Sequence, residues 1–331
     1  MEHVNGHRVL VTGGSGFIGS AVVAGLLEHG ASVTVLDRQP HPDPRIDSVV
    51  AELEEPAARE SAVSRGVSGI IHLAAATSVL RSMQDPVGVY AANVAVTAGL
   101  LELARTHGVD RFILASTNAV TGDVGRQPIH ERMPLRPLTP YGATKAACEM
   151  LLSGYAGSYG LAGSALRFTN VYGPGMGHKD SFVPRLMRAA LAGGGVQVYG
   201  DGQQVRDFVH VDDVVDSLLL AWRTRHVGPL IVGSGRSISV NELVAEARAV
   251  SDSPLPVEHT DPKPGEMPAV IVDIAAAREL GYRPTVSLRG GLAGVWGDFR
   301  RQEGQAFRGQ EGQAFRRQGA QAPTAASVPG Q

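Results

Sequence analysis

The sequence predicts an α/β fold in which a doubly wound parallel sheet carries a smaller, discontinuous second domain. Short apolar runs alternate with segments of helical periodicity from residue 8 to about residue 170, which is typical of strands and helices that build a parallel sheet. A glycine-rich turn joins the first run to the first helix, and after Pro174 the alternation gives way to loop-rich sequence.

Composition and charge exclude several classes of protein. The 331 residues are 43% hydrophobic, carry a formal net charge of −2 and include one cysteine, Cys148. A disordered chain and a nucleic-acid binder are therefore not expected, nor is a disulfide framework or a cysteine-based zinc site. We find no apolar run approaching the ~18 residues of a membrane span and no signal peptide. The expectation is a soluble cytoplasmic protein with no metal, nucleic-acid or membrane partner.

A dinucleotide-binding turn is predicted near the N-terminus. Arg8 to Thr12 form a short apolar strand, and a helix follows through about His29. Between them Gly14, Gly16 and Gly19 satisfy the spacing G-x-G-x-x-G. These glycines allow a tight turn and let backbone amides meet a pyrophosphate at the helix N-terminus.

An acidic residue at the end of the second strand indicates which dinucleotide is bound. The strand from Ala31 to Leu36 ends at Asp37, 18 residues past Gly19, where a carboxylate would hydrogen-bond an adenosine ribose. The carboxylate would repel a 2′-phosphate, which favours NAD over NADP. Arg38 could stack on adenine or be solvated, and its presence keeps NADP open as the alternative cofactor.

Further strands bring more candidate residues to one edge of the sheet. The predicted elements are strands at Gly69–Ala74, Arg111–Ser116 and Ala165–Thr169, and helices at Pro86–Thr106 and Tyr141–Tyr159. Ligands of such sheets bind at the carboxyl ends of the strands. Leu73 to Ala75, Ser116 with Thr117, and Asn170 all lie at such ends, so we expect them to converge. The whole is a Rossmann-type sheet.

A tyrosine and a lysine open the helix near the middle of the chain. Tyr141 and Lys145 are four residues apart, so both side chains point the same way. Tyrosine alone is a poor base, with a reference pKa of about 10, and a lysine ammonium beside it is expected to lower that pKa. Such a pair suits removal of a proton from an alcohol while hydride leaves its carbon.

The chain divides into two domains and a tail. Residues 1–174 with about 207–233 are predicted to form the dinucleotide-binding domain, and residues 175–206 with 234–300 the smaller one. The smaller domain is expected to contain helices near Val183–Ala192, Asn241–Ser251 and Leu288–Arg300. An eight-residue segment, 302–309, recurs almost unchanged as 310–317. Because this composition cannot bury a core, residues 301–331 are expected to be disordered.

Several motifs in order resemble those of one family. They are Thr12–Gly19, His72–Ala75, Asn93, Ser116-Thr117, Tyr141 with Lys145, Arg167–Pro174 and Arg206–Asp213. From about Arg8 to Arg300 the chain resembles an extended short-chain dehydrogenase/reductase of the nucleotide-sugar epimerase/dehydratase group. The resemblance implies an NAD cofactor, an NDP-sugar substrate, and a homodimer formed through the helices that follow Pro86 and Tyr141.

The resemblance also implies roles for individual residues. Tyr141 would be the general base, Lys145 its tuner and ribose anchor, and Thr117 the hydroxyl that meets the sugar O4. The cofactor would be bound by Gly13, Gly16, Phe17, Ile18, Gly19, Asp37, Arg38, Glu52, Leu53, Leu73, Ala74, Ala75, Asn93, Ser116, Tyr141, Lys145 and Phe168. The substrate would be bound by Thr77, Thr117, Asn118, Tyr141, Asn170, Lys179, Ser181, Phe182, Val198, Tyr199, Arg206, Lys263 and Glu266.

Departures from the family pattern narrow the reaction. Relatives that eliminate water, and those that decarboxylate, carry acids straight after the Ser/Thr position, whereas this chain has Asn118 and Ala119. A 4-epimerase acting on a UDP-hexose or UDP-glucuronate is therefore expected. An NDP-4-ketosugar reductase and a non-catalytic, redox-sensing dinucleotide binder are the alternatives. Lys179 could meet a C6 carboxylate or be solvated, and Val270 leaves room for an N-acetylhexosamine.

Overall fold

The computed structural model describes residues 3–64, 66–262 and 267–319, with side chains through residue 304. Its centre is a seven-stranded parallel sheet in the order β10-β6-β5-β4-β1-β2-β3. The strands are β1 (Arg8–Thr12), β2 (Ser32–Asp37), β3 (Asp47–Val50), β4 (Gly69–His72), β5 (Arg111–Thr117), β6 (Ala162–Phe168) and β10 (Gly228–Val232). The strand order reverses between β1 and β4, as in a Rossmann fold, and the predicted fold class is confirmed.

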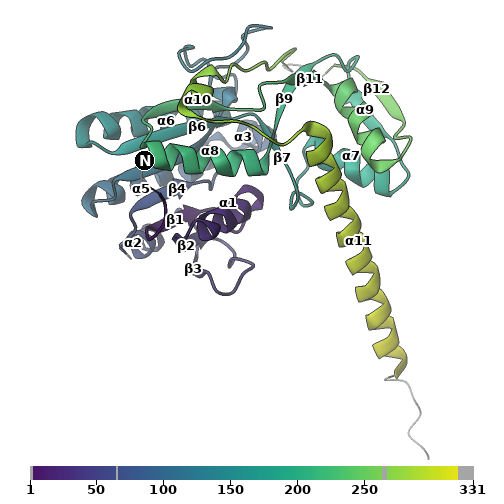
Figure 1. The fold of residues 1–331 in the computed structure, drawn as a ribbon, viewed down its shortest axis with the longest axis horizontal. Coiled ribbons are helices and arrows are strands. Elements are labelled where there is room, and N and C mark those ends of the chain that lie inside the picture. The colour runs from purple at the N-terminus through teal and green to yellow at the C-terminus, as the bar shows by residue number, and fades with distance from the viewer. Residues whose placement is uncertain (1–2, 65, 263–266, 320–331) are drawn as a thin grey trace, which may run out of the picture.

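Helices cover both faces of this sheet (Figure 1). One face packs against α1 (Phe17–Glu28) and α8 (Val211–Thr224), which contact each other. The other packs against α2 (Pro56–Val63), α5 (Val96–Thr106) and α6 (Pro140–Tyr159). Apolar strand residues on alternate sides enter the two core clusters: Val9 and Val11 of β1 face the first, and Leu10 faces the second. This alternation of side chains fixes the layers of the fold.

The helix predicted at Pro86–Thr106 is interrupted. It consists of α4 (Pro86–Tyr90), a π-helical turn η1 (Ala91–Ala95) and α5. Among the described residues this segment alone is long and apolar enough to cross a membrane by length and composition, and 44% of the window is buried in the protein. The sequence analysis expected no apolar run of this length. Polar residues such as Asn93 and Glu102 interrupt the run, and the segment was therefore not recognised. A buried core helix passes the same test, so the finding is weak.

A second group of elements follows the strand β6. The strands β7 (Asn170–Tyr172), β9 (Val205–His210) and β11 (Ser237–Ser239) form one small sheet, and β8 (Val196–Tyr199) with β12 (Val257–Thr260) form another. The helices α7 (Phe182–Leu191), α9 (Val240–Ser251) and α11 (Leu288–Gly319) pack together in a third core cluster. Three shorter helices complete the described chain: α3 (Val79–Gln84), η2 (Asn118–Val120) and α10 (Ala275–Leu280).

The last helix is longer than predicted. It was expected to end near Arg300, but α11 continues to Gly319 and projects away from the body of the molecule (Figure 1). The structure describes residues 301–319 as helix where the sequence predicted disorder, and residues 320–331 lie outside the described residues. Phe299 is buried in the third core cluster, which anchors the helix at that point. Good helix formers such as Gln, Glu, Ala and Arg then allow it to continue.

Candidate active site

The glycine turn after β1 has no room for side chains. Gly13 adopts φ +71°, and a Cβ there would lie 2.8 Å from the Ala74 nitrogen. A Cβ on Gly19 would lie 2.0 Å from the Gly13 carbonyl oxygen. Gly16 begins α1 with no side-chain cap, so first-turn amides remain available to an anion. These observations fit the pyrophosphate of a dinucleotide.

Asp37 lies beside this turn, at the end of β2. Its carboxylate accepts hydrogen bonds from the Ser15 amide at 3.0 Å and the Gln39 amide at 3.3 Å. The carboxylate is thereby held at the carboxyl edge of the sheet, where a ribose would meet it. Arg38 next to it is exposed, as is Glu52, whereas Leu53 is buried in the core cluster that includes Ala58.

The helix α6 is positioned by its first turn. Thr139 caps it by accepting a hydrogen bond from the Gly142 amide at 3.2 Å, and Pro140 opens the helix, where its missing amide hydrogen costs nothing. Tyr141 follows, partly buried. Burial raises the pKa of Tyr141 to about 12, and a hydrogen bond with Thr117 counters part of that rise. Thr117 and Tyr141 therefore meet from two different elements.

Lys145 is fully enclosed one turn further along α6. Its side chain is buried, and Nζ donates a hydrogen bond to the Ala115 carbonyl oxygen at 3.0 Å. Burial lowers the pKa of Lys145, and Cys148 and Glu149 counter this. Burial and the Thr117 hydrogen bond are the two influences on the pKa of Tyr141, so the expected lowering of this pKa by Lys145 stays a prediction.

Two buried polar residues support the strand ends. His72 binds Thr12 through Nδ1 at 2.6 Å and Thr97 through Nε2 at 3.1 Å, and burial lowers its pKa to about 3. Asn93, in the π-helical turn, accepts from the Ala76 amide at 2.8 Å and donates to Thr144 at 3.0 Å. Asn93 thus fastens the loop after β4 to α6, a role that its place in a sequence motif did not show.

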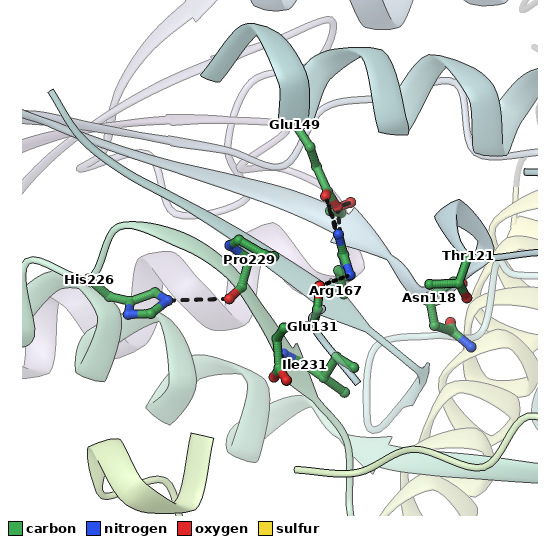
Figure 2. Close-up of polar contacts among 9 residues, drawn as sticks. Asn118, Thr121, Glu131, Glu149, Arg167, His226, Pro229 and Ile231 are labelled. Atoms are coloured by element: carbon green, nitrogen blue, oxygen red, sulfur yellow. Dashed lines mark hydrogen bonds and ion pairs between the residues drawn. The ribbon is translucent and has the colours of Figure 1, made fainter. Parts of the chain in front are cut away.

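A buried ion pair that sequence reasoning missed links α6 to the ends of β5 and β6 (Figure 2). Arg167 donates to both carboxylate oxygens of Glu149, the shortest contact being 2.7 Å, and both side chains are 3% exposed. Ser116 donates to Glu149 Oε1 at 2.5 Å. Arg167 also donates to the Glu131 carbonyl oxygen at 3.3 Å. A glutamate one turn after the Tyr–Lys pair was the signal that could have found it.

A cavity of about 440 Å³ lies among β7, β8, β9 and α7. Six predicted substrate residues line it: Asn170, Ser181, Phe182, Val198, Tyr199 and Arg206. Asn170 is oriented by donating to the Asp207 carbonyl oxygen at 2.9 Å. The lining also contains Arg185 and Gln204, which sequence reasoning missed. Arg185 follows Ser181 by one helical turn, and that spacing was the available signal.

Other predicted residues lie elsewhere or outside the described chain. Thr77 is exposed, and Lys179, a half-buried loop residue whose pKa burial lowers, does not line the cavity. The Asn118 carbonyl accepts from the Thr121 hydroxyl at 2.8 Å, which closes the turn after β5. Lys263 and Glu266 lie outside the described residues. The described part of the chain contains no cluster of three or more residues suited to a metal.

The chain belongs to the NAD dependent epimerase/dehydratase family, whose model matches residues 9–233. A solved UDP-glucose 4-epimerase of Thermotoga maritima, with UDP-glucose, is 33% identical with a TM-score of 0.84, covering 89% of this chain and 99% of its own. The structure of MoeE5 with UDP-glucuronic acid and NAD is 36% identical with a TM-score of 0.80, covering 89% and 99%. A dTDP-glucose 4,6-dehydratase of Streptomyces griseus is 34% identical, covering 86% and 92%. The resemblance predicted from the sequence motifs is confirmed.

Proposed function

We propose that this protein is an NAD-dependent nucleotide-sugar 4-epimerase acting on a UDP-hexose or UDP-glucuronate. The observation that carries the proposal is the site after β5. Tyr141, Lys145 and Thr117 converge there, whereas Asn118 and Ala119 provide no second acid or base. Elimination of water, the reaction by which the dehydratase relatives are named, needs such groups. Transfer of one proton and one hydride at C4 does not.

The residues act as follows. Phe17, Ile18, Asp37 and the glycine turn would hold NAD, which supplies a hydride acceptor for the sugar C4. Tyr141 takes the proton from O4 as general base, and Thr117 donates a hydrogen bond that stabilises the phenolate. Lys145 adds positive charge from the same helix face. Return of the hydride to the opposite face of the sugar requires that the sugar can turn.

The cavity supports a UDP-sugar as the substrate. Arg185 and Arg206 both line it, and among the residues that the structure describes no carboxylate lines it. Guanidinium groups match the forked geometry of a diphosphate, while Tyr199 and Val198 provide an apolar surface for the base. Gripping the diphosphate rather than the sugar leaves the hexose able to rotate between the two hydride transfers.

Lys179 gives a test of the sugar's C6 substituent. We infer that it meets a C6 carboxylate, which is supported by its partial burial in the loop after Pro174. Lys179→Ala should then slow UDP-glucuronate turnover at least about tenfold while sparing UDP-glucose, since a charge-assisted contact is worth about 1.5–3 kcal/mol. Equal losses on both substrates would remove this role.

Three further features belong to the proposal. Residues 175–206 and 234–300 form the substrate-binding domain, and residues 1–174 with 207–233 form the NAD-binding one. The protein is a homodimer, supported by apolar side chains on α3, α4 and α6 that are more than half exposed: Leu80, Met83, Val87, Tyr90 and Met150. Its location is the cytoplasm, where its nucleotide ligands would be supplied.

Two rivals are separated by the cofactor. An NDP-4-ketosugar reductase must exchange its oxidised cofactor after every turnover, whereas an epimerase regenerates its own. NAD retained through purification therefore favours the epimerase, and dependence on added NADPH favours the reductase. A redox sensor would need no catalytic base, so Tyr141→Phe distinguishes a sensor from both enzymes. If this variant behaved like the wild type in every assay, the result would support the sensor.

A further inference from the structure

Lys145 and Glu149 lie four residues apart on α6, and both are buried. At this spacing a lysine and a glutamate on a helix can pair, and burial strengthens attraction between opposite charges. In the described structure they do not pair. The Lys145 ammonium donates to the Ala115 carbonyl oxygen, and the Glu149 carboxylate is bound by Arg167 and Ser116.

We propose that Arg167 is a positioning residue that holds the Glu149 carboxylate away from Lys145, and so keeps the Lys145 ammonium at the catalytic edge of the sheet. The inference rests on the role given to Lys145 in the proposed function. It concerns a residue that touches neither the reacting atoms nor the cavity lining.

The geometry of the pair supports this role. Arg167 comes from β6 and reaches Glu149 with Nε and Nη2, so both carboxylate oxygens are engaged (Figure 2). The Ser116 hydroxyl approaches the same carboxylate from β5. The remaining guanidinium nitrogen, Nη1, donates to the Glu131 carbonyl oxygen. Because planar arginine forks fix direction as well as charge, the carboxylate is held by Arg167 and Ser116 rather than by Lys145.

Removing the guanidinium should reverse this arrangement. A buried carboxylate without its cation is strongly unfavourable, and the ammonium one helical turn away is the nearest replacement on α6. The groups that influence Lys145 are Cys148 and Glu149 on its own helix and His72 on β4, which stays neutral because its pKa is about 3. Burial raises the pKa of the Cys148 thiol, which favours its neutral form. Glu149 is therefore the charged acidic group of this set that can draw Nζ from Ala115.

The titration of Lys145 is the most direct test, because the chain has three lysines, Lys145, Lys179 and Lys263. The full chain, with cofactor as purified, is labelled with ¹³Cε-lysine and titrated by NMR, and Lys145→Arg assigns the signal. Arg167→Met should raise the pKa of Lys145, since Glu149 then pairs with it. Glu149→Gln should lower this pKa, since an attractive charge is lost and Arg167 is left without its counter-ion.

Rescue separates positioning from a structural role. Arg167→Met should lower kcat about tenfold or more through loss of orientation, whereas Arg167→Met/Glu149→Gln has no carboxylate to draw Lys145 away. In the double variant the pKa of Lys145 should return to its wild-type value, and kcat should return to within about threefold of the wild type. A neutral replacement of a buried pair is tolerated. A double variant as impaired as Arg167→Met would overturn the proposal.

A matched control is another buried arginine of the same sheet. Arg111 is 2% exposed at the opposite end of β5, with its guanidinium 4.9 Å from the Trp222 ring centroid. Arg111→Met should lower stability and leave the titration of Lys145 unchanged. A similar shift in this control would overturn the proposal, as would an unchanged titration of Lys145 in Arg167→Met. If Arg167→Met fails to fold, Arg167→Lys takes its place: it keeps the charge but loses the planar fork, so the pKa of Lys145 should still rise, and an unchanged titration would overturn the proposal. The titration needs no substrate, so it stands apart from failure of the epimerase assay.

Discussion

In the proposed reaction Thr117 and Tyr141 carry the proton chemistry from two different elements. Thr117 ends β5, where its side-chain oxygen accepts the Ala119 amide hydrogen at 3.2 Å, so its own proton is free to be donated. Tyr141 lies in the first turn of α6, and the hydrogen bond from Thr117 opposes the rise of its pKa on burial. The base is active only as the phenolate, so activity should increase with pH toward the pKa of Tyr141.

Replacing Thr117 tests this coupling. Thr117→Val removes the hydrogen bond, so the pKa of Tyr141 should rise further and the ascending limb of the rate profile should move to higher pH. At neutral pH we expect kcat to fall about 10- to 100-fold, within the range for acid–base groups. Thr117→Ser should stay close to the wild type. An unshifted limb in Thr117→Val would contradict the coupling.

His72 makes stability depend on pH. Its pKa of about 3 in the folded protein lies below the ordinary value of 6.5, so the unfolded chain binds the proton more readily between these values. Stability is therefore lost as pH falls below 6.5 toward 3. From pH 6.5 to 5 the loss should reach about 2 kcal/mol, at 1.36 kcal/mol per pKa unit. Urea unfolding should show a shallower loss for His72→Asn, and equal slopes would refute the assignment.

At the scale of elements, the turn between β1 and α1 is the most constrained segment. Gly19→Ala would place Cβ 2.0 Å from the Gly13 carbonyl oxygen. Because that contact is with backbone, the turn must distort, and NAD should be lost on purification with a drop in thermal midpoint. Gly154→Ala on α6 is the matched control: its Cβ meets nothing within 4 Å. It should stabilise the protein by about 0.5–1 kcal/mol. Retained NAD in Gly19→Ala would count against the turn as the cofactor site.

The glycine turn could be predicted from the sequence, but the buried ion pair of Glu149 and Arg167 could not. Gly14, Gly16 and Gly19 reveal themselves by spacing, because backbone constraints are local. Glu149 and Arg167 are 18 residues apart and meet only when β6 packs beside α6. Their pairing is a property of the tertiary fold. The same holds for Arg185, whose place in the cavity depends on how α7 lies against β8 and β9.

At the scale of the molecule, an apolar surface follows α3, α4 and α6, which contact one another. Leu80, Met83 and Tyr90 are each more than half exposed there, and exposed apolar patches of this kind mark interaction sites.

The long helix α11 was not predicted beyond residue 300. Phe299, which anchors the helix, is buried by the rest of the fold, and this burial could not be predicted from local composition.

The proposed homodimer can be broken at that surface. Met83→Glu places a charge where a partner copy would bury an apolar side chain, so the molar mass from light scattering should fall from dimer to monomer. Val50→Glu is the control, since Val50 is 52% exposed on the strand β3 at the far edge of the sheet. This variant should remain dimeric. A dimeric Met83→Glu would place the interface elsewhere.

In the proposed reaction the site moves one proton and one hydride at C4 and carries out no elimination. The most direct measurement incubates the purified protein, without added cofactor, with UDP-glucose and UDP-glucuronate deuterated at C4 and follows the products by NMR. We expect the C4 epimer with deuterium kept at C4, and no product with Tyr141→Phe. Formation of a 4-keto-6-deoxy sugar, or turnover only with added NADPH, would rule out the proposed 4-epimerase reaction.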